Sequence, residues 1–261
     1  MARQNFVRSH VALNSKPWPS RCCTAERAQW RRAAPAARAG VLAIALMALT
    51  AGCSTGGGEG GDELGDIPQE LASVESLAED AFDEALLGNA SNVFDLATQL
   101  RTDWDAYRPE GVDDGALPAD LQQIDAAIVA LLDVAAVSVD PVELGRASNA
   151  ISAPMPQLFD LYAPIVPVEL LALDFDGREV ILDAIADDFP SATTNVDVIE
   201  ATWAAFKSEV IDAGGTLEAG QYDAVIVALR AAITATDAIE LRAQSNISLD
   251  LVDAIEALFG G

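Results

Sequence analysis

The sequence has almost none of the side chains that usually carry out nucleophilic catalysis or bind transition metals. Its 261 residues include one His and three Cys, and His10, Cys22 and Cys23 all lie among the first 52 residues. Beyond them the chain has only Cys53, no His, and a single Lys, Lys207. Without imidazoles and paired thiols, Cys–His and Ser–His–Asp catalysis, zinc sites of these ligands and disulfides are excluded from that part. We therefore expect no enzyme, no catalytic residues, no cofactor and no metal site.

Basic residues are also scarce, and they are unevenly placed. The formal net charge is −26, yet the first 52 residues hold eight of the fifteen Lys and Arg and one of the 41 Asp and Glu. The remainder has 40 acids against 7 bases, a net charge of −33. Phosphate binding requires a positive surface, so nucleic acid is excluded as a ligand. Such acidity serves either hydration in salty surroundings or recruitment of a cationic ligand or envelope protein, and its even spread favours hydration.

A short apolar run near the N-terminus has the layout of a secretory signal. Arg31, Arg32 and Arg38 precede apolar residues 41–49, and small residues follow at 50–52. A positive flank, a short apolar core and small residues before a cut are typical of a signal peptide. The run is too short to span a bilayer, which needs about 20 residues. An uncleaved membrane helix is the alternative, and the Gly-rich stretch after Cys53 favours processing instead. The long region before the run suggests a gene start placed too far upstream.

The segment from Leu49 through Thr, Ala and Gly52 to Cys53 resembles the bacterial lipobox. This resemblance implies a lipoprotein precursor that is cut between Gly52 and Cys53, with lipid attached to Cys53 as the membrane anchor. It places the protein at a bacterial cell membrane or outer membrane, facing the periplasm or the exterior. Ser54, rather than Asp, is similar to lipoproteins exported to an outer membrane. Residues 53–66 are rich in Gly and acids, so we expect them to form a flexible linker.

From residue 67 onward the apolar pattern is helical. In the sequence around Ile124, Ile128 and Leu131, apolar residues recur at steps of three and four, which is one stripe of an amphipathic helix. Ala is abundant and strand-like alternation is rare, so the fold class is predicted to be all-α. The predicted helices lie near residues 69–87, 90–108, 118–138 and 141–162, and then near 168–187, 192–213, 217–235 and 238–259.

Internal similarity predicts that these helices form two copies of one unit. Residues 104–110 recur as 203–209, and residues 123–131 recur as 221–229. Short loops between amphipathic helices favour antiparallel neighbours, so each unit is predicted to be an up-down four-helix bundle. The first repeat covers residues 67–163 and the second covers 164–261, after a signal peptide at 1–52. The body is similar in architecture alone to the duplicated helical bundles of iron-uptake and imelysin-type periplasmic proteins, whose His–Glu signature is absent.

Polar residues shared by both repeats are the candidate sites. Asn149 and Asn246 follow Ser148 and Ser245 within predicted helices, where such residues are not favoured. They either fix the register of the bundle by hydrogen bonds or line a polar ligand-binding groove between the repeats.

Other polar residues have simpler structural explanations. Asp140 with Glu143, and Asp237 with Glu240, fit capping boxes. Asp125 and Asp223 fit the positive ends of helices. A partial calcium-loop pattern at 174–177 lacks its further ligands, so no calcium site is predicted.

The sequence thus predicts a membrane-anchored, extracytoplasmic lipoprotein that acts as a non-enzymatic binding or envelope-interaction module. The alternative is a periplasmic protein that binds a cation or small ligand between the two repeats. Its partners would be the membrane, through the lipid on Cys53, and a cationic ligand or an envelope protein.

Overall fold

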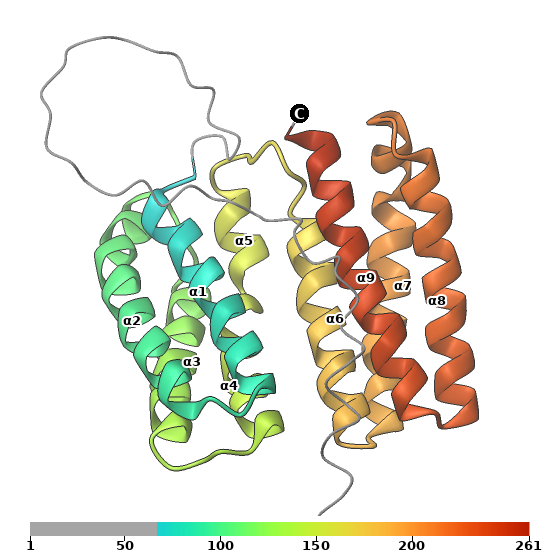
Figure 1. Ribbon diagram of the computed structural model, residues 1–261. Coiled ribbons are helices and arrows are strands. Elements are labelled where there is room, and N and C mark those ends of the chain that lie inside the picture. Colours follow the sequence, from blue (N-terminus) through green and yellow to red (C-terminus); the bar gives the residue numbers. More distant parts are fainter. Residues whose placement is uncertain (1–66, 261) are drawn as a thin grey trace, which may run out of the picture. The chain divides into compact units, whose positions relative to one another are not determined.

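A computed structural model describes residues 67–260 of the chain. The described part is a helical bundle without strands, which confirms the all-α prediction (Figure 1). Its nine helices are α1 (Gln69–Leu86), α2 (Ala90–Asp113), α3 (Pro118–Ala135), α4 (Pro141–Ser152), α5 (Met155–Asp160), α6 (Glu169–Ile185), α7 (Phe189–Asp212), α8 (Thr216–Ala235) and α9 (Ala238–Phe259). The expected signal peptide, Cys53 and the linker lie outside the described residues. None of the helices in 67–260 is long and apolar enough to cross a membrane.

The helices pack in two groups, each around its own apolar core. In the first group α1 and α3 each contact α2 and α4, and in the second α6 and α8 each contact α7 and α9. One core is formed from α1 to α5 and contains Trp104 and Tyr107, and the other is formed from α6 to α9 and contains Trp203 and Tyr222. Burial of these apolar stripes, at about 25 cal/mol per Å², is the main force that holds each group together.

Proline accounts for two differences between the predicted and the observed helices. The helix expected at 141–162 is split, because α4 ends at Ser152 and Pro154 and Pro156 begin the short helix α5. A proline has no N–H to continue the hydrogen bonds of the preceding turn. The break expected at Pro109 was wrong, since α2 continues through this exposed proline to Asp113. The chain turns instead at Gly115, whose φ of +96° favours glycine.

The two predicted Asp caps are present, although the capping boxes are incomplete. Asp140 accepts hydrogen bonds from the backbone N–H groups of Val142 and Glu143, and Asp237 accepts one from Glu240. The predicted return bond from Glu143 to the start of the helix is replaced by a contact with Ser138, whose Oγ lies 2.6 Å from Glu143 Oε2. The caps therefore satisfy helix N–H groups mainly through the Asp side chains.

Candidate functional site

Each core contains a tryptophan whose indole nitrogen donates to a partly exposed carboxylate on the next helix. Trp104 Nε1 lies 2.8 Å from Asp125 Oδ1, and Trp203 Nε1 lies 2.9 Å from Asp223 Oδ1. A cation four residues after each tryptophan pairs with the same acid: Arg108 with Asp125, and Lys207 with Asp223. These shared acids thus join neighbouring helices, a role that the helix-end interpretation missed. A cation four residues after Trp in both copies was the available signal.

The structure treats the two candidate asparagines differently. Asn149 is buried between α4 and α6, where its Nδ2 donates to Phe175 O at 3.0 Å and to Glu179 Oε1 at 2.8 Å. Asn246 is exposed, and its Nδ2 donates to Arg242 O on its own helix. The two side chains therefore share no polar lining, and only Asn149 takes part in a contact between the helix groups.

Helix α6 carries an unusual number of charged side chains into the protein interior. Asp176, Arg178 and Asp183 are all buried, and Asp174 and Glu179 are largely covered. Burial and the nearby Glu179 raise the pKa of Asp176 to about 7. Buried charges are costly unless they are paired, so these side chains require partners of opposite charge or hydrogen bonds.

Arg178 is the centre of a cluster that joins α1, α4 and α6. Its Nη2 lies 2.6 Å from Glu79 Oε1 and also pairs with Asp174. Its Nη1 lies 4.0 Å from Glu75 Oε1 and 3.4 Å from Ser152 Oγ. We call these five residues the Arg178 cluster. Glu79 belongs to α1 of the first helix group and Arg178 to α6 of the second, so the cluster connects the two groups.

The Arg178 cluster contains more carboxyl groups than its single guanidinium can neutralise. Burial, helped by Glu79, raises the pKa of Glu75 to about 8. Burial also raises the pKa of Glu79 and of Asp174, against the opposing effect of Arg178. Glu75 therefore favours its protonated form near neutral pH.

A second ionic group connects α4 to α6 and is better balanced. Arg146 donates to Glu179 Oε2 at 2.8 Å and to Asp183 Oδ1 at 2.7 Å. Asn149 supplies a further donor to Glu179, and Asn195 of α7 supplies one to Asp183. Both ionic groups thus have a structural role, which is to join helices. Within residues 67–260 no group of three or more His, Cys, Asp or Glu is arranged to hold a metal ion.

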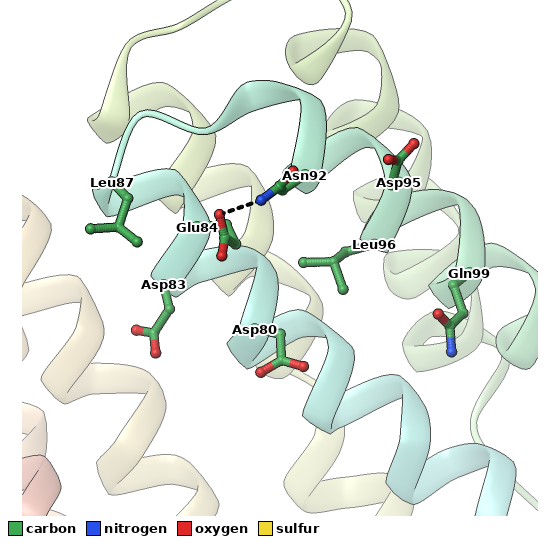
Figure 2. Close-up of a pocket in the computed structure, with 8 residues that line it drawn as sticks. All are labelled: Asp80, Asp83, Glu84, Leu87, Asn92, Asp95, Leu96 and Gln99. Atoms are coloured by element: carbon green, nitrogen blue, oxygen red, sulfur yellow. Dashed lines mark hydrogen bonds between the residues drawn. The ribbon is translucent and has the colours of Figure 1, made fainter. Parts of the chain in front are cut away.

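An open pocket lies on the surface between the end of α1 and the start of α2 (Figure 2). It has a volume of about 590 Å³ and is lined by Asp80, Asp83, Glu84, Leu87, Asn92, Asp95, Leu96 and Gln99. We call it the acidic pocket. Four carboxyl groups and two leucines line it, and no basic side chain does. Such a lining favours a cationic ligand with an apolar part.

Hydrogen bonds hold part of the acidic pocket in place. Glu84 Oε2 accepts from Asn89 Nδ2 at 2.7 Å and from Asn92 Nδ2 at 2.9 Å, which fixes the turn between α1 and α2. Figure 2 shows the bond to Asn92. Burial, Glu79 and Glu84 raise the pKa of Asp80, so the charges of this face affect one another. The acids of this pocket are spaced as on any solvated helix face, so the sequence pattern did not indicate a site here.

A second, smaller hollow of about 90 Å³ is lined mainly by apolar side chains near the connection between the helix groups. Phe159 and Leu171 contribute to its walls, and Glu256 is its one charged residue. Burial and Asp174 raise the pKa of Glu256 to about 8. Comparison with protein-family models, with curated proteins and with solved structures found no match for this chain.

Proposed function

We propose that this protein is a lipid-anchored, extracytoplasmic bacterial lipoprotein whose helical body is a non-enzymatic binding module for a cationic partner. The lipobox-like segment that ends at Cys53 supports the anchor, and the absence of His and Cys from 67–260 supports a binding role. The observation that carries the proposed binding activity is the acidic pocket of about 590 Å³, whose lining includes four carboxyl groups and no basic residue. A polyamine or a basic segment of an envelope protein has the matching charge.

The same proposal includes the origin of the body as two copies of an up-down four-helix bundle. The equivalent contacts of Trp104 with Asp125 and of Trp203 with Asp223 support it, and so do the matching cations Arg108 and Lys207. These pairs recur at a separation of 98 or 99 residues, as the sequence similarity does. Split helix α4–α5 is the main departure of the first copy from the second.

The position of the acidic pocket distinguishes this proposal from a site between the copies. The pocket is formed by α1 and α2 of the first copy alone. The alternative groove would use Asn149 and Asn246 together, and the exposure of Asn246 gives it less support. A cation held within one copy is therefore the favoured form of the ligand-binding proposal.

The anchor is tested by fractionation of cells that produce Cys53→Ser. We expect this variant to leave the membrane fraction or to accumulate uncut, because the thiol that receives lipid is gone. Cys22→Ser and Cys23→Ser are matched controls, and both should behave like the parent protein. Normal cleavage and unchanged membrane retention of Cys53→Ser would contradict lipidation.

The ligand class is tested by isothermal titration calorimetry with spermidine at low ionic strength. The double variant Glu84→Gln/Asp95→Asn should bind about tenfold or more weakly, since each charge contributes on the order of 1 kcal/mol near water. The control Glu209→Gln/Asp212→Asn removes the same charge from exposed positions on α7 and should bind like the parent. Equal affinities of the two double variants, or no heat with the parent, would refute a cation site in the acidic pocket.

A further inference from the structure

The contact between the two helix groups is built from positions that are equivalent in the two copies. Along α1 the stripe is Glu75, Glu79, Phe82 and Leu86, and 99 residues later along α6 it is Asp174, Arg178, Ile181 and Ile185. The steps of four, three and four place each set on one face of its helix. Phe82 packs with Ile181 and Leu182 in a small apolar cluster, and the Arg178 guanidinium lies 5.8 Å from the Phe82 ring centre.

The apolar part of this contact has no titratable group, whereas the polar part has a large excess of acid. Phe82, Ile181 and Leu182 are almost fully buried. At the other end the Arg178 cluster holds three carboxyl groups around one cation. The desolvation penalty of ionising all three carboxyl groups in the interior exceeds the Coulombic attraction that one guanidinium provides. The stability of the contact therefore depends on where protons are held.

The neighbouring helices add acid and no cation to this end. On α9, burial raises the pKa of both Glu256 and Asp253. Acids of the cluster add to this, because Asp174 further raises the pKa of Glu256 and Glu79 further raises that of Asp253. From α4 the group that reaches Glu75 is the hydroxyl of Ser152. The charged groups that act on Glu75 are Asp174 and Arg178 from α6 and Glu79 from its own helix, α1.

We propose that the α1–α6 contact is a proton-controlled latch, closed while Glu75 carries a proton and loosened when it ionises. Two further observations support the assignment to Glu75. Its Oε2 is buried and has no hydrogen-bond partner among residues 67–260, so an ionised oxygen there would be unsatisfied. Arg178 Nη2 is paired with Glu79 and Asp174. Glu75 is therefore approached only by Arg178 Nη1, at 4.0 Å from its Oε1.

The direction of the response follows from the raised pKa values. Glu75 and Glu256 both have a pKa raised to about 8 in the folded protein, from an ordinary value of 4.5. A raised folded pKa stabilises the closed contact at low pH, and this stabilisation is lost as the pH rises through about 8. Arg146 pairs directly with both Glu179 and Asp183 and continues to join α4 to α6, so loosening begins where α1 meets α6.

Hydrogen exchange followed by mass spectrometry on the full chain tests the latch. Protection factors, corrected for the intrinsic rates, are compared between about pH 6.5 and about pH 9 for peptides of α1 and α6 against peptides of α3 and α8. One carboxyl whose pKa moves from 4.5 to about 8 changes the opening equilibrium by about 30-fold over this range. We expect α1 and α6 to lose about that factor more protection than α3 and α8.

Neutral substitution separates the latch from a general effect of alkali. Glu75→Gln keeps the shape of the side chain and cannot ionise, so it should remove most of the additional loss at α1 and α6. Glu70→Gln, at an exposed position on the same helix, should retain it. If Glu75→Gln does not fold, carbon-13 NMR of the carboxyl groups in the parent chain gives the pKa of Glu75 directly, and a value near the ordinary 4.5 would overturn the proposal. Equal losses in all four helices, or an unchanged pH response of Glu75→Gln, would also overturn the proposal.

Discussion

Removal of one oxygen atom from each of two buried tyrosines should change the stability of this protein in opposite directions. Tyr222 of α8 is fully buried against Trp203, with the ring centres 4.5 Å apart, and its hydroxyl has no hydrogen-bond partner within residues 67–260. Burial accordingly raises the pKa of Tyr222. Tyr107 of α2 is equally buried, but its hydroxyl lies 3.2 Å from that of Tyr162, which in turn donates to Asp114 at 2.8 Å.

The expected magnitudes follow from these two environments. A buried hydroxyl without a partner costs about 1–3 kcal/mol of desolvation, so Tyr222→Phe should raise the free energy of unfolding by about 1–2 kcal/mol. Tyr107→Phe breaks a hydrogen bond and leaves Tyr162 with one partner fewer, which should lower it by about 0.5–1.5 kcal/mol. Both variants keep the aromatic ring, so packing and apolar burial change little.

Urea unfolding followed by far-UV circular dichroism measures both changes against the parent protein. For a domain of this size, each kcal/mol corresponds to a shift of roughly 2–4 °C in the melting temperature, which gives a second measurement by calorimetry. A Tyr222→Phe variant that is destabilised as strongly as Tyr107→Phe would show that the Tyr222 hydroxyl is well satisfied in solution. The reasoning from unpaired buried groups would then fail for this core.

Three other changes test separate parts of the structure. The free energy of unfolding should fall as the pH rises from about 6 to about 8, by up to about 1.4 kcal/mol per pH unit for a single group. The reason is that Glu75, whose pKa is raised to about 8 in the folded protein, keeps a proton that it has lost in the unfolded chain. Glu75→Gln should flatten this slope in urea titrations at several pH values. Asp140→Ala should cost about 1 kcal/mol through loss of the α4 cap, measured by thermal unfolding. Gly220→Ala, whose Cβ would meet no atom within 4 Å, should stabilise α8 by up to about 1 kcal/mol. Gly177→Ala should lack this gain, because its Cβ would lie 2.6 Å from Leu249 Cδ2 and the Leu249 side chain would have to move.

The helical character of the body could be predicted because each helix buries one apolar stripe. The predicted ends of the last helix, 238–259, agree with α9. The ends near prolines were harder, since the effect of a proline depends on where its missing N–H would point. Pro109 lies on an exposed face and α2 continues through it, whereas Pro154 and Pro156 follow the end of α4 and start a new helix. Periodicity alone does not carry this distinction.

The charged interior of α6 could not be predicted from local pattern. Asp174 and Arg178 are four residues apart, a spacing that also occurs in ion pairs on solvated helices. Their burial depends on α1, whose Glu79 lies 99 residues away. The two asparagines illustrate the same limit, because Asn149 and Asn246 occupy matching positions in the sequence and yet only Asn149 meets a neighbouring helix. The surroundings of each asparagine therefore depend on which helix faces it, and its equivalent position in the repeat does not predict them.

The indole–carboxylate pairs provide the protein with two natural optical probes. Within residues 67–260 there are two tryptophans, Trp104 in one core and Trp203 in the other, and each donates to an acid at less than 3 Å. Because tryptophan emission responds to the field of a nearby charge, Trp104→Phe and Trp203→Phe, each made in a chain whose Trp18 and Trp30 are also replaced by Phe, would each report on one helix group separately. Comparison of their unfolding curves would reveal whether the two copies melt as one cooperative unit or in sequence.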